Sequence, residues 1–477
     1  AQDISELPSN STILQTITMK SFALACLGTV SAQQAGTLEK NYEWPMEFEI
    51  NGKKKTVALT LDSNWRWAHK VGESTNCYTE NTWDAGTCGT EGTATSCAEK
   101  CAIGAVPKKT WTETYGVTAH KGGVDLGFVT QGPYSKNVGS RMYVLNGDHY
   151  WQFHVLNKEI SWDVDMSDMP CGTNGALYFV EMPSDGGLSD GTLNKAGPKY
   201  GTGYCDAQCP RDLKWEHGRA NTKEWVPNPK DPYKNSGTGN LGACCAEIDL
   251  WEANRHAMSF TMHPSLKEGV VYCHGDEECG TPGGDRFRAV TDRNGCDVNP
   301  NRFNVTDFYG RGSEFKLDTT KPFTVVTQFH DTNEELSVTQ HYIQGGKKIE
   351  HPNYLGKKLG NAEADDFCQA RAKAMDDRDS FTEKGGMKNV RGALKRGVTL
   401  VLSMWDDIDV HMNWLDSVMD GDDVSKPGNY RGPCKPEYGN PERLREKHPD
   451  SHVSFYNWKY GDIGTTDSAH GLNEVTV

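Results

Sequence analysis

Three carboxylates lie close together in residues 247–252, which read Glu-Ile-Asp-Leu-Trp-Glu. Large apolar residues separate the acids, and this alternation indicates a β-strand, whose successive side chains point to opposite faces. Glu247 and Asp249 then share one face, with Ile248 and Leu250 behind them. Two glutamates held close together, one ionised and one protonated, are the equipment of retaining glycoside hydrolysis. An ordinary edge strand with solvent-facing acids fits these six residues equally well.

The catalytic interpretation requires a distortion of this strand. On an ideal strand Glu252 faces away from Glu247, because five residues is an odd step. Both side chains can line one cleft only if the strand bulges or turns near Trp251, and bulges are common beside active sites. A retaining pair also needs carboxyl groups only about 5–5.5 Å apart, whereas five extended residues cover roughly 16 Å. We therefore predict bent backbone and converging side chains here.

The elements that must position these acids are predicted from periodicity. Alternating apolar runs separated by turn residues indicate antiparallel sheets packed as a sandwich, an all-β fold. The runs lie at residues 57–61, 124–128, 160–166, 323–329, 398–402 and 453–455. Only two helices are predicted with any clarity, over residues 362–375 and 387–395. The 50 glycines and 21 prolines fit short strands joined by many turns.

Composition indicates one secreted domain. The net charge of −15 disfavours nucleic acid and anionic membranes as partners and fits action on a neutral polymer. Residues 19–32 have the basic start, short apolar core and small-residue cleavage site of a signal peptide, and the apolar core is too short to span a membrane. Residues 1–18 match no pattern. With no linker or repeat in evidence, residues 33–477 are expected to form a single catalytic domain without a carbohydrate-binding module.

The cysteine count agrees with secretion. The chain has 15 cysteines, and Cys26 lies inside the expected signal peptide. The remaining cysteines are even in number and fit seven disulfides. Their spacing does not resemble a zinc site, so neither a catalytic metal nor another cofactor is expected.

The acidic strand lies within a longer motif, residues 244–254, which read Cys-Cys-Ala-Glu-Ile-Asp-Leu-Trp-Glu-Ala-Asn. This motif resembles the signature of glycoside hydrolase family 7, the cellobiohydrolases and related endoglucanases. Residues 204–214, 174–182, 64–67, 128–131 and 405–407 resemble further family blocks, so the resemblance covers residues 33 to about 464. Family 16 enzymes share the E-x-D-x-x-E strand but lack the other blocks. The resemblance implies a concanavalin-like β-jelly-roll sandwich with long loops that form a substrate tunnel.

The resemblance also assigns roles to the acidic strand. It implies that Glu247 is the nucleophile and that Glu252 is the general acid/base. Asp249 is expected to hydrogen-bond and orient the nucleophile. His263 matches a family histidine near the site, which implies an orienting or substrate-contacting role.

Substrate-contacting residues follow from the same family blocks. Four tryptophans are implied to stack on pyranose rings: Trp65, Trp67, Trp405 and Trp414. Polar contacts are implied for Arg141, Asn174, Tyr178, Asp206, Gln208, Arg286 and Arg431, the last two on the product side. The alternative for Trp65 and Trp67 is that they share one strand face and simply pack.

The family pattern further implies the disulfide pairs. They are Cys77–Cys101, Cys88–Cys97, Cys171–Cys434, Cys205–Cys245, Cys209–Cys244, Cys273–Cys279 and Cys296–Cys368. Separately, Asn304 begins the only glycosylation sequon after the signal peptide.

The lengths of several loops indicate whether the enzyme cleaves at chain ends or within the chain. Residues 221–241 form a long segment that endoglucanases of the family shorten, and residues 280–288 and 419–431 are also retained. We therefore expect a roofed tunnel and a monomeric, processive cellobiohydrolase acting on the reducing ends of cellulose. The shortened segment 280–285, and Asp409 where the family commonly has an aromatic residue, predict looser closure. The alternatives are an endo-β-1,4-glucanase and a non-catalytic, lectin-like carbohydrate-binding protein.

Overall fold

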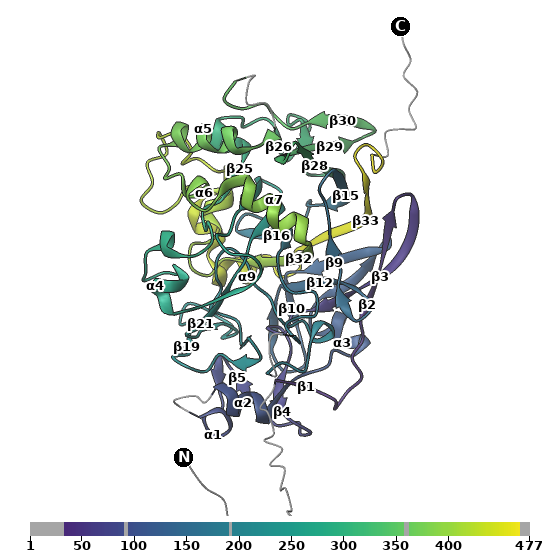
Figure 1. Ribbon diagram of the computed structural model, residues 1–477, viewed down its shortest axis with the longest axis vertical. Helices are drawn as coiled ribbons and strands as arrows, with labels where there is room; N and C mark the ends of the chain where they lie inside the picture. The colour runs from purple at the N-terminus through teal and green to yellow at the C-terminus, as the bar shows by residue number, and fades with distance from the viewer. Residues whose placement is uncertain (1–32, 90–93, 190–192, 357–361, 468–477) are drawn as a thin grey trace, which may run out of the picture. The chain divides into compact units, whose positions relative to one another are not determined.

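The structure is a computed structural model that describes residues 33–89, 94–189, 193–356 and 362–467. The expected signal peptide and the segment before it lie outside these residues. Two antiparallel sheets pack face to face, as the alternating runs predicted (Figure 1).

The first sheet, called sheet I here, carries the acidic strand. Its neighbouring strands, in spatial order, are β3 (Lys53–Leu61), β12 (Ser140–Asn146), β32 (Val398–Asp406), β16 (Thr173–Val180), β22 (Glu247–Ala253), β23 (Met258–His263) and β25 (Cys296–Val298). At one end of sheet I, β32 and β22 finish and β12 and β16 start. At the other end β22 starts at Glu247.

The second sheet, sheet II, covers one face of sheet I. Its strands, in order, are β8 (Val117–His120), β9 (Gly123–Gly127), β33 (His452–Asp462), β15 (Lys158–Asp165), β28 (Phe323–Thr332) and β29 (Glu335–Gln344), with β30 (Lys347–Glu350) and β31 (Ala362–Glu363) on β29. Strand β2 (Trp44–Ile50) joins the sheets, because it pairs antiparallel with β3 and parallel with β33.

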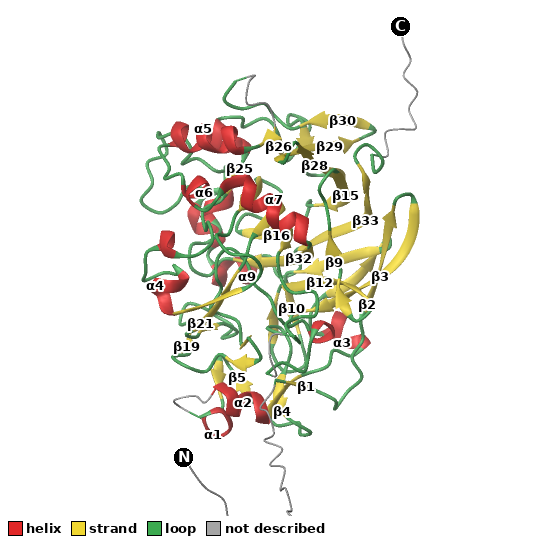
Figure 2. Ribbon diagram, viewed as in Figure 1, coloured by secondary structure: helices red, strands yellow, loops and turns green. Residues whose placement is uncertain are grey.

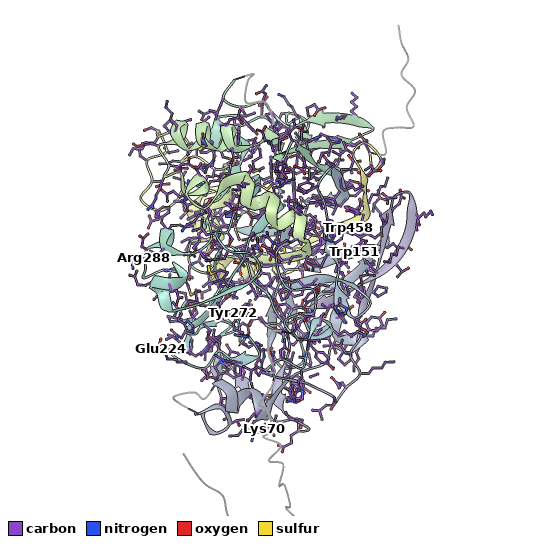
Figure 3. All side chains as sticks on the ribbon, viewed as in Figure 1. Lys70, Trp151, Glu224, Tyr272, Arg288 and Trp458 are labelled. Carbon is purple, nitrogen blue, oxygen red and sulfur yellow. A yellow bond between two sulfur atoms is a disulfide. The ribbon has the colours of Figure 1, made fainter. Side chains whose placement is uncertain are left out.

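Alternate residues of both sheets fill the space between them. Leu400, Leu402 and Met404 of β32 and Ile160 and Trp162 of β15 belong to one fully buried cluster. Close to the joining strand, Trp151 and Trp458 add to this core, with ring centroids 5.4 and 5.9 Å from that of Phe48 (Figure 3). Burial of this many large side chains is the main force that holds the sandwich together.

Helices are short and lie outside the sheets (Figure 2). The two predicted helices are present as α5 (Asp365–Met375) and α7 (Gly386–Arg396). The first begins three residues later than predicted, because Ala362 and Glu363 pair with β29. The others are α1 (Ala85–Cys88), α2 (Ala94–Lys100), α3 (Lys108–Glu113), α4 (Gly275–Cys279), α6 (Ser380–Glu383), α8 (Asn413–Asp416) and α9 (Pro441–Lys447). Over the described ranges, none of the helices has the length and apolar character needed to cross a membrane.

Short strands and turns organise the long connections between these elements. Those used below are β10 (Val129–Gln131), β11 (Lys136–Val138), β19 (Val226–Pro227), β20 (Gly237–Thr238), β21 (Leu241–Cys244) and β24 (Val271–His274). The seven predicted disulfides are all confirmed. The longest, Cys171–Cys434, joins residues 263 positions apart.

Candidate active site

Strand β22 contains the predicted bulge. Tyr178 lies opposite Asp249, but Leu177, the preceding residue, lies opposite Trp251, so Leu250 is the extra residue. A matching shift occurs on the β23 side, between Asp249 and Glu252. Leu250 and Trp251 both pack into the core between the sheets. The extra residue therefore brings Glu252 back to the face of sheet I that carries Asp249.

Glu247 is held by a backbone donor and by its neighbour. The amide N–H of Ala207 donates to Glu247 Oε2 over 2.9 Å, and the carboxyl groups of Glu247 and Asp249 are hydrogen-bonded to each other. Two disulfides, Cys205–Cys245 and Cys209–Cys244, fasten residues 205–209 beside the start of β22. The position of the Ala207 N–H is thus fixed covalently on both sides.

His263 lies directly opposite Glu247 on β23. Its Nε2 is 3.0 Å from Asp249 Oδ2, and its Nδ1 is 2.7 Å from the carbonyl oxygen of Asp292. A carbonyl oxygen can only accept, so Nδ1 carries a hydrogen. The contact between Nε2 and Asp249 then also contains a proton, which links His263, Asp249 and Glu247 into one hydrogen-bonded row.

Glu252 has a different environment. Asn174, which is fully buried, donates from Nδ2 to Glu252 Oε1 over 2.9 Å and accepts from the N–H of Ala253 over 3.1 Å. Burial raises the pKa of Glu252 to about 7, although the Asn174 hydrogen bond acts to lower it. At neutral pH and below, Glu252 therefore retains a proton for a large part of the time. Asn174, expected as a substrate contact, instead holds this carboxyl group in place.

The other two acids cannot both ionise freely. Burial and then the charge of Asp249 raise the pKa of Glu247, while burial and then the charge of Glu252 raise that of Asp249. The hydrogen bond between the two carboxyl groups lowers the pKa of Asp249, so the pair shares one proton at neutral pH, and the Ala207 N–H and His263 act to lower the pKa of Glu247.

A chain of hydroxyl groups extends the site across the sheet. The Tyr178 and Tyr204 hydroxyl oxygens are 2.8 Å apart, and Tyr204 donates to Asp206 Oδ2 over 2.7 Å. Gln208 donates its backbone N–H to Asp206 over 2.7 Å and its side-chain amide to the Arg293 carbonyl over 3.0 Å. The sequence placed Tyr178, Asp206 and Gln208 at the site. Tyr204 was missed, although it belongs to the same family block.

Arg141 is fixed by a residue that the sequence did not single out. Its Nε lies 2.7 Å from Asp62 Oδ2, and Asp62 also accepts from the Tyr143 hydroxyl. The guanidinium carbon is 3.5 Å from the Tyr204 ring centroid and 5.3 Å from that of Trp65. An ion pair and two aromatic faces thus hold Arg141 rigidly beside the tyrosine chain.

The four tryptophans lie in two regions, the turn after β3 and the end of β32. Trp65 and Trp67 lie in the turn after β3, so the alternative that they share a strand face is wrong. The Trp67 side chain is 37% exposed, and its ring centroid is 4.3 Å from that of His69. Trp405 and Trp414 stack with centroids 6.2 Å apart and planes inclined by 28°. All four remain at least partly accessible.

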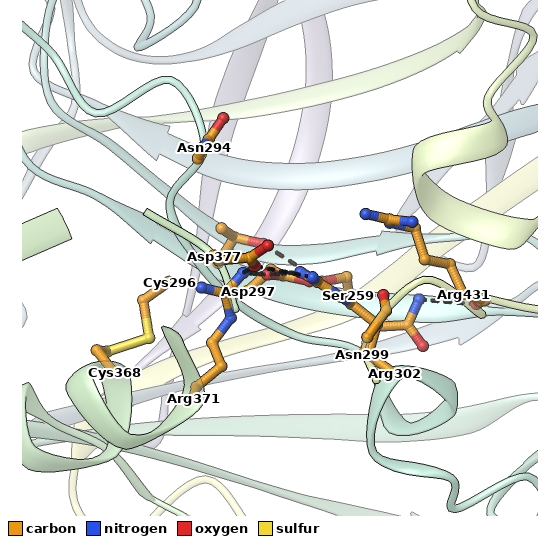
Figure 4. A network of polar contacts seen from close by, with 12 residues as sticks. Ser259, Asn294, Cys296, Asp297, Asn299, Arg302, Cys368, Arg371, Asp377 and Arg431 are labelled. Carbon is orange, nitrogen blue, oxygen red and sulfur yellow. Dashed lines mark hydrogen bonds and ion pairs between the residues drawn. A yellow bond between two sulfur atoms is a disulfide. The ribbon is translucent and has the colours of Figure 1, made fainter. Parts of the chain in front are cut away.

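The two arginines expected on the product side differ in their hydrogen-bond partners. Arg286 is exposed and donates to the Arg293 carbonyl over 3.0 Å. Arg431 donates to the Asn429 carbonyl over 3.0 Å, and Asn299 holds the Arg431 carbonyl over 2.9 Å (Figure 4).

Beside Arg431 lies an ion-pair network that the sequence did not indicate. Asp297 accepts from both Arg302 and Arg371, and Asp377 lies 2.9 Å from Arg302 and 3.3 Å from Arg371 (Figure 4). Burial disfavours the Asp297 anion, but the two arginines hold its pKa well below the ordinary value. The network joins η3 (Pro300–Phe303), β25 and α5 into one support for this end of the site.

Among the described residues, five groups of His, Cys, Asp or Glu side chains lie close enough together to hold a metal ion. Four of these groups contain disulfide-bonded cysteines. The fifth comprises Glu247, Asp249 and His263, with one ligand atom of each within 4.8 Å of the others. This oxygen and nitrogen set could hold a divalent cation. However, its members are already hydrogen-bonded to one another and to backbone groups.

Comparison with known proteins decides the family. Residues 46–467 match the model of glycosyl hydrolase family 7. The chain belongs to glycosyl hydrolase family 7. The family predicted from the sequence motifs is thereby confirmed, and with it the jelly-roll sandwich.

Individual family 7 relatives are similar over most of their length. Exoglucanase GH7B of Limnoria quadripunctata is 43% identical over 451 residues, which cover 94% of this chain and 99% of that protein. The crystal structure of a family 7 cellobiohydrolase from Daphnia pulex is 43% identical, with a TM-score of 0.87 over 91% of this chain and 100% of the other. A cellobiohydrolase from Melanocarpus albomyces complexed with cellotetraose is 38% identical, with a TM-score of 0.83 over 90% of this chain and 99% of the other.

Proposed function

We propose that this family 7 protein is a secreted cellobiohydrolase that cleaves β-1,4-glucan with retention of configuration. In this proposal it releases cellobiose processively from the reducing ends of cellulose. The observation that carries the chemistry is the bulged strand β22, which presents Glu247, Asp249 and Glu252 on one face. The exoglucanase and cellobiohydrolase relatives support the substrate.

Glu247 acts as the nucleophile in this proposal. The Ala207 N–H stabilises its anion, and the hydrogen bond with Asp249 aims the carboxylate. Attack on the anomeric carbon forms a glycosyl-enzyme and breaks the bond to the leaving glucan oxygen. His263 positions Asp249 and is not itself required to contact the sugar.

Glu252 acts as the general acid and then as the base. Its raised pKa keeps a proton available for the leaving oxygen. After the cellobiose leaves, the resulting carboxylate takes a proton from water as the water oxygen attacks the anomeric carbon. The bond between the sugar and Glu247 breaks, which restores the Glu247 carboxylate and the protonated Glu252. In both steps Asn174 holds the Glu252 carboxyl group in position through its hydrogen bond to Oε1.

In this proposal aromatic and polar groups around these acids hold the glucan chain. The proposed stacking platforms are Trp65 and Trp67, which follow β3, and Trp405 and Trp414, which stack at the end of β32. Arg286 and Arg431 are proposed to contact the released cellobiose. Seven disulfides support secretion, and Asn304, which is exposed, is a proposed glycosylation site.

A product profile on cellulose tests the proposal. Cellobiose should dominate the soluble products, and the viscosity of a soluble cellulose derivative should fall slowly. Proton NMR of fresh hydrolysate should show the β-anomer first, as retention requires. An initial α-anomer would contradict the retaining mechanism. Rapid loss of viscosity with few reducing ends would favour the endoglucanase instead.

A further inference from the structure

Residues 221–241 form a hairpin whose base is tightly closed. Asn221 donates from its amide to the carbonyls of Arg211, Leu213 and Leu241 over 2.9–3.2 Å, and its amide oxygen accepts from the Leu241 N–H. Strands β19 and β20 then pair along the arms. The segment, called the roof hairpin below, therefore projects as a unit from the residues that lead into β22.

The chain from the tip of the roof hairpin to Glu247 connects the two ends of the strands in sheet I. The base of the hairpin precedes Glu247, at the end of the sheet where β22 starts. Its tip reaches the opposite end, where Asn235 donates to the carbonyl of Lys136 on β11 over 3.0 Å. The other face of these strands is packed against sheet II. Ala243, two residues after the hairpin, packs with Tyr178 and Val401 on the face of sheet I that is turned away from sheet II. The chain from the tip to Glu247 therefore runs along the face that carries Glu247, Asp249 and Glu252.

One aspartate organises the tip from within. Asp231 accepts from the N–H groups of Tyr233, Asn235 and Ser236 and from the Ser236 hydroxyl over 2.8–3.1 Å. Its side chain is only 1% exposed. Burying this charge would be costly without a cationic partner.

Arg445 of α9 supplies that partner and connects it to sheet I. Its Nη1 is 2.7 Å from Asp231, while its Nε and Nη2 lie 2.8 and 2.9 Å from the two oxygens of Asp406. The side chains of Arg445 and Asp406 are 3% and 2% exposed. Asp406 ends β32 and directly follows Trp405. Although burial acts to raise the pKa of Asp231, the guanidinium lowers it below its ordinary value.

A second ion pair at the tip provides a contrast. Lys230 lies 3.3 Å from Asp409, but their side chains are 61% and 59% exposed. Water and salt screen such a pair, so it holds the tip only weakly. The position that the sequence analysis associated with looser closure is therefore not the one that fastens the hairpin.

We infer that Arg445 is a specificity-determining positioning residue: its buried ion pairs with Asp231 and Asp406 fasten the roof hairpin across the cleft beside Trp405. The inference rests on the proposed cellobiohydrolase function. A fastened roof admits a glucan by its end and resists binding in mid-chain. Releasing the tip should turn end-directed cleavage towards internal cleavage without changing the chemistry at Glu247.

The test compares R445Q with wild type and with K230A as the matched control. We expect R445Q to reduce the viscosity of soluble cellulose derivatives several-fold faster than wild type does. On cellulose, we expect the ratio of soluble to insoluble reducing ends to be at least twofold lower. Its kcat/KM on an aryl cellobioside should stay within twofold of wild type, and K230A should behave as wild type. A folded R445Q with the wild-type ratio would overturn the inference.

Two further measurements keep the outcomes separable. If R445Q does not fold, D231N/D406N/R445M replaces all three charged groups and leaves no unpaired buried charge. It should show the same change in product ratio, and an unchanged ratio overturns the inference. Hydrogen exchange should be faster at the Asn235 and Ser236 amides in the variants than in wild type. Equal exchange rates would show that Arg445 does not fasten the hairpin. Internal cleavage by wild type itself would refute the proposed function, while hydrogen exchange would still decide whether Arg445 fastens the hairpin.

Discussion

At the scale of single residues, the site separates two glutamates by their surroundings. Glu247 accepts the Ala207 N–H, which favours its anion, and shares a hydrogen bond with the Asp249 carboxyl group. Glu252 receives one amide N–H in a buried position, which leaves its pKa near 7. This difference is what a nucleophile and a general acid need at one pH.

Replacing Glu247 by Gln keeps the shape and removes the attacking charge. We expect activity on cellulose and on an aryl cellobioside to fall by about a thousandfold or more, with cellobiose binding and the thermal midpoint nearly unchanged. E159Q is the matched control, because Glu159 is a buried glutamate of β15 in the other sheet. Near-normal turnover by E247Q would refute the assignment.

The pH dependence should report Glu252. A general acid works only while protonated, so kcat/KM on phenyl cellobioside should fall as the pH rises through about 7. The Asn174 hydrogen bond lowers this pKa, so N174A should raise it and move the alkaline limb to higher pH. A limb that stays in place or moves to lower pH in N174A would contradict the role of Glu252.

At the scale of elements, the bulge in β22 and the turn after β3 decide where side chains point. Alternation predicted the strands, and the odd spacing of Glu247 and Glu252 predicted the bulge. Periodicity did not predict the turn at residues 62–67, because Trp65 and Trp67 are also spaced as strand neighbours. Contacts between residues far apart in sequence also could not be predicted from local patterns. Nothing close to Asn174 in the sequence indicates Glu252, and nothing close to Asp231 indicates Arg445.

The turn after β3 presents Trp67 as an accessible platform. W67A should lower activity on crystalline cellulose roughly 3- to 10-fold, the effect of losing one aromatic contact. Activity on a small soluble cellobioside should be unchanged, because only a long chain reaches this ring. W67F retains an aromatic face and should recover most of the loss. An equal loss on both substrates would mean that Trp67 supports the fold instead.

At the scale of the whole molecule, one disulfide encloses most of the chain. Cys171–Cys434 closes a loop of 263 residues and Cys273–Cys279 one of 6. In the chain-entropy account these loops contribute nominally about 5–6 and about 2 kcal/mol to stability. C171A/C434A should therefore lower the thermal midpoint more than C273A/C279A does, as calorimetry can measure. The reverse order would show that strain or residual structure outweighs loop length.

The adjacent cysteines Cys244 and Cys245 have a consequence for how the protein must be produced. Their partners, Cys209 and Cys205, lie four residues apart, so exchanging the two bonds gives an isomer with the same number of disulfides. That isomer would displace the Ala207 N–H from Glu247 while leaving no free thiol. A preparation can thus be fully oxidised, correct in mass and inactive. Yield of active enzyme should then depend on disulfide isomerase capacity in the producing cell, and only peptide mapping would distinguish the isomers.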